Sequence, residues 1–352
     1  MDSLPSSSKR SWALGPSHLP FVGREAILLA TEDAFRQATE GVGQIVLLSG
    51  EPGIGKTRMA EQVSAIARAR GALVTWGSCH EWEGAPAYWP WTQVLRTGLQ
   101  SRGPDGLSQL SPLQRALLGQ IMPELLDQGL GSDPPPPIPQ EPEARLYQLL
   151  VATSALVRAT VIQQPLVIVL DDIHWADIPS LQLLRFLAID TRNLPVLIIA
   201  TYRDAEIGPL HPAAAIITDL SREPHCIRLS LHGLTKQQVA RFMEIIAGTR
   251  QPASLVDVIF EETGGNPFFV TEVVRLLAEE HSLGSSAAGV SRLQVPEGVR
   301  GAIRRRVDRL SSACQRVLTV ASVAGRDLDV RVLAQVTGMS ALELLDVLDD
   351  AV

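Results

Sequence analysis

The sequence contains 352 residues, and at about 100–200 residues per domain this length predicts two or three domains. Its hydrophobic content of 45% and charged content of 20% are those of a globular protein and exclude disorder of the whole chain. A formal net charge of −7 argues against a nucleic-acid-coating surface, because phosphate binding needs an excess of lysine and arginine on one face. The three cysteines, Cys79, Cys226 and Cys314, lie far apart without paired spacing, so we expect reduced, partly buried thiols and no metal site.

The N-terminal segment does not resemble a targeting signal. Residues 1–20 are rich in serine and proline and lack the charged-then-apolar order of a secretion signal, so we expect them to be disordered. The sequence contains no apolar, uncharged stretch of about 18 residues, the length that a membrane helix needs. We therefore expect a cytoplasmic protein that makes no membrane contact.

Helices and strands are expected to alternate from residue 21 to about residue 232. Apolar positions at helical spacing predict a helix over residues 25–40 and another from Lys56 to about Arg70. Five short apolar or β-branched runs predict strands: Gln44–Ser49, Ala72–Gly77, Leu166–Leu170, Val196–Thr201 and Ile227–Leu231. This order predicts an α/β domain with a parallel sheet and helices on both faces.

An insertion over residues 78–142 interrupts this domain between the second and third expected strands. It contains an aromatic cluster and the proline run 134–137, which we expect to be a stiff, solvated spacer. The cluster consists of Trp82, Tyr88, Trp89 and Trp91.

The strand pattern ends at Thr235. Helical periods then predict a small helical domain over residues 233–282, and a Gly/Ser/Ala-rich joint follows it. Residues 283–352 read as this linker and three further helices. Because the chain stops inside a helical pattern, we expect a third domain that is cut short.

Residues Gly50–Thr57 (GEPGIGKT) match the phosphate-binding pattern GxxxxGK(S/T) in full, between a predicted strand and a predicted helix, as the pattern requires. Its glycines let backbone N–H groups point at a phosphate chain, which the following helix N-terminus also attracts. Lys56 would bridge the terminal phosphates, and the Thr57 hydroxyl would bind Mg²⁺. The alternative is a glycine-rich turn with a surface lysine. The expected nucleotide contacts in this segment are Gly50, Gly53, Ile54, Gly55, Lys56, Thr57 and Arg58.

Charged residues follow two of the other expected strands. Asp171 and Asp172 end the third strand, so Asp171 is the candidate Mg²⁺ ligand and Asp172 the candidate to polarise an attacking water. The alternative is that this pair caps the helix starting near Pro179. Arg203 follows the fourth strand, where it could neutralise a γ-phosphate, or pair with Asp204 on the surface.

Five segments in the same order resemble the signal-transduction ATPases with numerous domains, in particular the branch of large ATP-binding LuxR-type regulators, the maltose-regulon activator and multidomain nucleotide cyclases. The segments are Phe21–Glu25 (FVGRE), Gly50–Thr57, Asp171–Asp177 (DDIHWAD), Ala200–Arg203 (ATYR) and Thr263–Phe269 (TGGNPFF). The resemblance extends from residue 21 to about residue 352. It implies an AAA-like P-loop ATPase domain, followed by a small helical domain and a winged-helix-like segment.

The resemblance also implies further nucleotide contacts. Val22, Gly23 and Arg24 would line the adenine, Arg203 would sense the γ-phosphate, and Pro267 would pack on the base from the helical domain. Two departures are visible. Residues 283–352 contain no histidine to hold an ADP phosphate, and Asp172 stands where many relatives have the longer glutamate, so we expect slow hydrolysis.

Other residues of these segments have simpler interpretations. We expect His174 and Trp175 to pack their loop, and residues 304–306, three arginines with acidic neighbours, to form a solvated helical face.

Three functions stay open on this evidence. The first is an ATP/ADP switch in a signalling protein or transcription regulator, with an unknown inducer, self-association in the ATP state, and nucleic-acid contact only through a domain outside this chain. The second is a DNA-loading ATPase of the replication-initiator type. The third is a scaffold that binds nucleotide without hydrolysing it.

Overall fold

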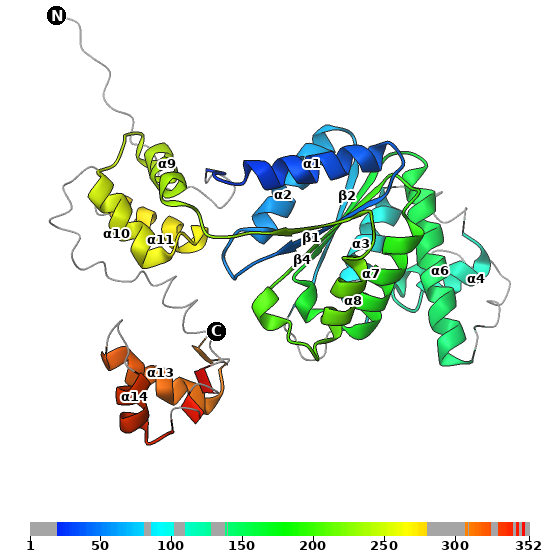
Figure 1. Ribbon diagram of the computed structural model, residues 1–352. Coiled ribbons are helices and arrows are strands. Elements are labelled where there is room, and N and C mark those ends of the chain that lie inside the picture. The colour runs from blue at the N-terminus through cyan, green and yellow to red at the C-terminus, as the bar shows by residue number, and fades with distance from the viewer. Residues whose placement is uncertain are drawn as a thin grey trace, which may run out of the picture. The chain divides into compact units, whose positions relative to one another are not determined.

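The computed structural model (Figure 1) describes residues 20–80, 86–101, 110–127, 138, 140–279, 307–308, 310–324, 330–340, 343–344 and 347–348. The predicted N-terminal tail, the proline run, Trp82, the joint after residue 282 and the three arginines at 304–306 lie outside these residues. The chain divides into two compact units, one over Phe21–Gly233 and one that includes the residues from Leu234 onward.

The first unit is built on a parallel sheet of five strands in the order β2-β3-β4-β1-β5, which confirms the predicted α/β fold. Each of the five predicted runs forms one strand, within about a residue at either end. The strands are β1 (Gln44–Ser49), β2 (Leu73–Ser78), β3 (Leu166–Asp171), β4 (Val196–Tyr202) and β5 (Cys226–Ser230). Strand β4 lies between β1 and β3, so the residues after these three strands meet at one edge of the sheet.

The central strands are apolar throughout because helices cover both of their faces. Every residue of β1, β3 and β4 is buried. On one face, Val46 and Leu48 pack against α1 (Glu25–Thr39) and α2 (Lys56–Ala69). On the other face, Ile45 and Leu47 belong to the core formed with α7 (Ile178–Asp190) and α8 (Pro212–Leu220). Figure 1 shows the sheet enclosed between these two helical layers.

The insertion between β2 and β3 is a packed helical layer where the structure describes it. It contains α3 (Trp89–Gln100), α4 (Pro112–Leu118) and α5 (Glu124–Asp127), and it leads into α6 (Pro142–Val161). These helices share a core of their own around Leu95, Leu118 and Leu156. Trp91 anchors this layer, because its fully buried indole N–H donates a hydrogen bond of 2.9 Å to the Ser180 carbonyl at the start of α7.

The second unit contains α9 (Lys236–Ala247), α10 (Ala253–Thr263) and α11 (Pro267–Glu279), where the helical periods predicted them. Thr235 starts α9 by accepting a hydrogen bond from the Gln238 N–H, and Gly248 ends the helix in the left-handed conformation. Farther along, α13 (Ser312–Ala324) and α14 (Val330–Thr337) pack around Val317 and Leu333. The winged-helix-like arrangement of this last segment stays a prediction.

In the described part of the chain, no helix combines the length and apolar character that crossing a membrane requires. Cys79 and Cys314 are buried and Cys226 is half-buried, and none of the three forms a disulfide within the described residues.

Candidate nucleotide-binding site

The loop between β1 and α2 has a backbone that favours the glycines of the predicted phosphate motif. Gly50, Gly53 and Gly55 have φ angles of 146°, 75° and 101°, in a region that side chains rarely adopt. At Gly50 space is limiting too, since an added Cβ would lie 2.7 Å from the Leu231 carbonyl oxygen. A loop of this form leads directly into the N-terminus of α2 at Lys56, as a phosphate-binding loop does.

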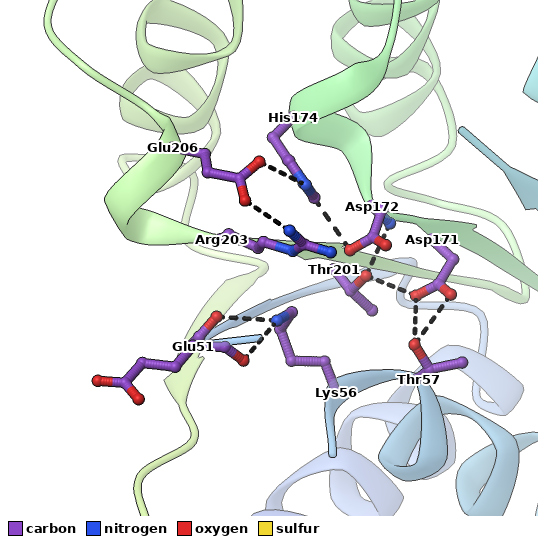
Figure 2. A network of polar contacts seen from close by, with 10 residues as sticks. Glu51, Lys56, Thr57, Asp171, Asp172, His174, Thr201, Arg203 and Glu206 are labelled. Carbon is purple, nitrogen blue, oxygen red and sulfur yellow. Dashed lines mark hydrogen bonds and ion pairs between the residues drawn. The ribbon is translucent and has the colours of Figure 1, made fainter. Parts of the chain in front are cut away.

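Lys56 is folded back onto this loop. Its Nζ donates hydrogen bonds of 2.8 Å to the Gly50 carbonyl and 3.0 Å to the Glu51 carbonyl, and the residue is buried. Burial lowers the pKa of Lys56, while the nearby Asp172 carboxylate opposes this shift. Figure 2 shows the Lys56 ammonium beneath Arg203 and beside these backbone carbonyls. Phosphate oxygens of a bound nucleotide would compete with the carbonyls for the ammonium.

Thr57 and Asp171 bring hard oxygen atoms together from two elements. The Thr57 hydroxyl lies 3.0 Å from Asp171 Oδ2, and the Thr201 hydroxyl at the end of β4 lies 2.6 Å from Asp171 Oδ1. In the described residues, no group of three or more His, Cys, Asp or Glu side chains could hold a metal on its own. A hydroxyl beside a carboxylate fits Mg²⁺, which keeps several waters and takes its other ligands from nucleotide phosphates.

Asp172 follows β3 in the left-handed conformation, with φ 58° and ψ 50°. Its backbone N–H donates a 2.8 Å hydrogen bond to the Thr201 hydroxyl, which fixes this unusual backbone against β4. Burial raises the pKa of the Asp172 carboxyl, and the adjacent Asp171 carboxylate raises it further. The alternative in which this pair caps the following helix is wrong, because Asp177 caps α7 by accepting a 2.8 Å hydrogen bond from the Ser180 N–H.

Arg203 lies at the end of β4, in the same cluster. Its Nη1 lies 2.5 Å from Glu206 Oε1, across the short helical turn η4 (Asp204–Glu206). The alternative pairing with Asp204 is wrong, since Asp204 pairs with Arg228 at 3.0 Å. Figure 2 shows the Arg203 guanidinium between Glu206 and the two aspartates.

The residues predicted to line the adenine lie at the start of α1. Val22 is buried, Gly23 has a φ of 74°, and Arg24 is the N-cap of the helix. The Arg24 side chain is buried as well, and its Nη2 donates a 3.0 Å hydrogen bond to the Ile54 carbonyl. Arg24 is therefore brought onto the phosphate loop itself, and burial lowers its pKa.

Two other predicted contacts lie in helices. Arg58 lies in the first turn of α2, and burial lowers its pKa. Pro267 begins α11 in the second unit, so its contact with the base stays a prediction.

The sequence interpretation missed three residues of the cluster: Thr201, His174 and Glu206. Thr201 joins Asp171 to the backbone of Asp172, as described above. His174, expected only to pack its loop, is buried in the turn η3 (Ile173–Trp175) and faces both Asp172 and Glu206. Of these three, only Glu206 carries a local signal, because it follows Arg203 by three residues, a spacing at which side chains on one helical turn meet.

Comparison with known proteins identifies the family. The model of the AAA ATPase domain family matches residues 20–199, just over half of the chain. An uncharacterised protein of Rhizobium meliloti (strain 1021) is 25% identical over 360 aligned residues, which cover 95% of this chain and 33% of that protein. The chain thus spans about a third of the length of this relative.

Solved structures with a similar fold include the Aeropyrum pernix ORC1 protein in complex with DNA, at 16% identity and a TM-score of 0.44, covering 96% of this chain and 86% of that one. They also include a Signal Transduction ATPase with Numerous Domains (STAND) protein with a tetratricopeptide repeat sensor from Pyrococcus horikoshii, at 14% identity and a TM-score of 0.43. This alignment covers 98% of this chain and 41% of that one. The structural similarity in both cases is too low to bear on function. The family match agrees with the phosphate loop, and the chain belongs to the AAA ATPase domain family.

Proposed function

We propose that this chain binds ATP and ADP with Mg²⁺, hydrolyses ATP slowly, and serves as a nucleotide-controlled switch in a larger signalling protein or transcription regulator. The observation that carries the proposal is the contact of Thr57 with Asp171 at 3.0 Å, beside the phosphate loop and the Lys56 ammonium. A nucleotide–magnesium complex needs these three groups together: a cation for the phosphates, a hydroxyl and a carboxylate for the metal.

Each residue of the site has a role in binding. Lys56 would exchange the Gly50 and Glu51 carbonyls for the terminal phosphates, which compensate its buried charge better than neutral carbonyls do. Thr57 and Asp171 would hold the Mg²⁺, whose charge offsets that of the phosphates. Arg24, bonded to the Ile54 carbonyl, would keep the phosphate loop in shape from α1.

Hydrolysis would depend on the two residues that follow β3 and β4. Asp172 would orient and polarise the attacking water, and Arg203 would neutralise charge on the γ-phosphate. Both charged groups lie close enough to Lys56 to influence its pKa, so all three face one small region. Asp172 reaches less far than a glutamate would, which is the reason to expect slow turnover.

The switch itself rests on the resemblance to signal-transduction ATPases. In this proposal Pro267 contacts the base from the helical unit, so that bound ADP favours a closed arrangement, and ATP with an inducer favours self-association. The inducer, the output and any nucleic-acid contact would belong to other parts of a longer protein. A cytoplasmic location is part of the same proposal. The relative's greater length supports only the proposal that this chain is one part of a longer protein, since the aligned residues make up 33% of that relative.

The direct test is calorimetric titration of the chain with ATP and with ADP, in the presence and absence of Mg²⁺, together with a phosphate-release assay. We expect both nucleotides to bind and phosphate to appear slowly. Failure of both nucleotides to bind would overturn the proposal. Binding without phosphate release would favour the scaffold function, and salt-dependent binding of duplex DNA would favour the initiator function.

A further inference from the structure

Glu206 joins two neighbours of the site through its two carboxylate oxygens. Oε1 lies 2.5 Å from Arg203 Nη1, and Oε2 lies 3.3 Å from His174 Nε2. The other ring nitrogen of His174, Nδ1, lies 3.8 Å from Asp172 Oδ1. A continuous series of polar side chains therefore connects the acid after β3 with the arginine after β4, as Figure 2 shows.

This series is held in a well-packed environment. The His174 side chain is 1% exposed, and the Arg203 side chain is 20% exposed. Both turns are fixed by backbone hydrogen bonds, from Trp175 N–H to the Asp172 carbonyl at 3.0 Å and from Glu206 N–H to the Arg203 carbonyl at 3.2 Å. The Arg203–Glu206 pair is half-buried, with side chains 20% and 29% exposed, so it is screened less than a pair on the open surface.

Glu206 engages only part of the Arg203 guanidinium. Arginine presents five N–H donors. Within the described residues, Arg203 Nε is buried without a hydrogen-bond partner, while Nη1 is held by Glu206. The guanidinium thus has donors left for a further anion, and it faces the region of Lys56 and Asp172.

We propose that Glu206, supported by His174, is a positioning residue that holds Arg203 ready for the γ-phosphate of ATP. The inference rests on the proposed function, because it assumes that a γ-phosphate reaches Arg203. A long arginine side chain loses conformational freedom when it binds an anion, and a carboxylate that already fixes it lowers this cost. ADP has no γ-phosphate, so Glu206 contributes to ATP binding and not to ADP binding.

The experiment measures one ratio on the full chain: the affinity for a non-hydrolysable ATP analogue (adenylyl imidodiphosphate) divided by that for ADP, both with Mg²⁺, by calorimetry. The variants are Glu206→Ala, Glu206→Gln, Arg203→Ala and the double variant of Glu206→Ala with Arg203→Ala. Asp204→Asn is the matched control, because Asp204 lies in the same turn and pairs with a different arginine, Arg228.

We expect Glu206→Ala to lower the ratio by about threefold or more, a change typical of coupled contacting groups, with ADP affinity unchanged. Glu206→Gln should lower the ratio less than Glu206→Ala does, since an amide oxygen still accepts a hydrogen bond from Arg203. Asp204→Asn should leave it unchanged. Once Arg203→Ala has lowered the ratio, adding Glu206→Ala should have no further effect, because Glu206 acts through Arg203.

Other results would overturn the inference. A ratio that stays constant or rises in Glu206→Ala means that Glu206 does not position Arg203, and equal effects with and without Arg203 mean that it acts by another route. If Glu206→Ala does not fold, Glu206→Leu carries the same test, because its side chain cannot accept a hydrogen bond from Arg203, and an unchanged ratio in this variant overturns the inference. A parent chain that binds both nucleotides with equal affinity refutes γ-phosphate sensing alone, whereas one that binds neither refutes the proposed function itself.

Discussion

The Thr57 hydroxyl donates a hydrogen bond of 3.0 Å to the Asp171 carboxylate, although the two residues are 114 positions apart in the chain. One lies in the first turn of the helix after the phosphate loop, and the other ends the buried strand β3. Both side chains are oxygen donors of the kind that Mg²⁺ prefers. The pair therefore connects the first turn of α2, directly after the phosphate loop, to the end of β3.

Asp171→Asn should keep nucleotide affinity measured without metal and reduce the gain in ATP affinity that Mg²⁺ brings, because a neutral amide is a poor partner for a hydrated dication. The measurement is a magnesium titration of ATP binding in the variant and the parent. Overlapping curves would show that Asp171 has only a structural role, accepting the Thr57 and Thr201 hydroxyls.

Lys56→Ala should weaken ATP and ADP binding by at least tenfold, about 1.4 kcal/mol, because it removes the cation that the proposed site directs at the phosphates. Lys236→Ala is the matched control, since this lysine is 54% exposed in α9 and pairs with Asp257 at 2.5 Å. Calorimetry on both variants gives the comparison. Equal affinities in the Lys56→Ala variant and the parent would refute the phosphate-site assignment.

Asp172→Asn should stabilise the ligand-free chain at about pH 7 while lowering phosphate release. Burial raises the pKa of Asp172 in the folded state, so the folded state holds its proton more tightly than the unfolded state does. The stability from this carboxyl is complete below its unfolded pKa and is lost as the pH rises through its folded pKa. Asparagine cannot ionise, so the variant does not lose this folding free energy as the pH rises.

The measurement for Asp172→Asn is the free energy of unfolding of both chains across the acidic to neutral range. The stabilisation should shrink on acidification, because the parent carboxyl then becomes neutral too. A constant difference between the two chains would mean that the effect comes from packing or from the left-handed backbone, which asparagine also tolerates.

ADP should stabilise the chain by about 2.7 kcal/mol at a hundredfold excess over Kd, or roughly 5–10 °C in melting temperature. If Pro267 contacts the base, as the resemblance implies, Pro267→Gly should reduce this shift. Pro252→Gly is the matched control, because Pro252 also begins a helix of the same unit, as the N-cap of α10. Equal ADP shifts in both variants and the parent would show that Pro267 makes no contact with the base.

The sequence by itself determined the five strands, the helices of the second unit and the phosphate loop, but not the helices α3, α4 and α5 of the insertion. The strand runs are apolar because β1, β3 and β4 are buried on both faces, and burial of this kind leaves a local pattern. The phosphate loop could be recognised because its glycines are required by backbone conformations that lie within one short segment, Gly50–Thr57. The helices of the second unit were likewise predictable, from the helical spacing of their apolar residues and from capping residues such as Thr235.

Only the tertiary structure decided which side chains meet. Parallel strands pair through backbone hydrogen bonds, which do not depend on the identity of the side chains. The position of β4 between β1 and β3 could therefore not be predicted from the sequence. That position brings Thr201 to Asp171 and Arg203 to the region of Asp172. The choice of Glu206 over Asp204 as the partner of Arg203 depends on how the chain turns in η4, a geometry set by neighbouring elements.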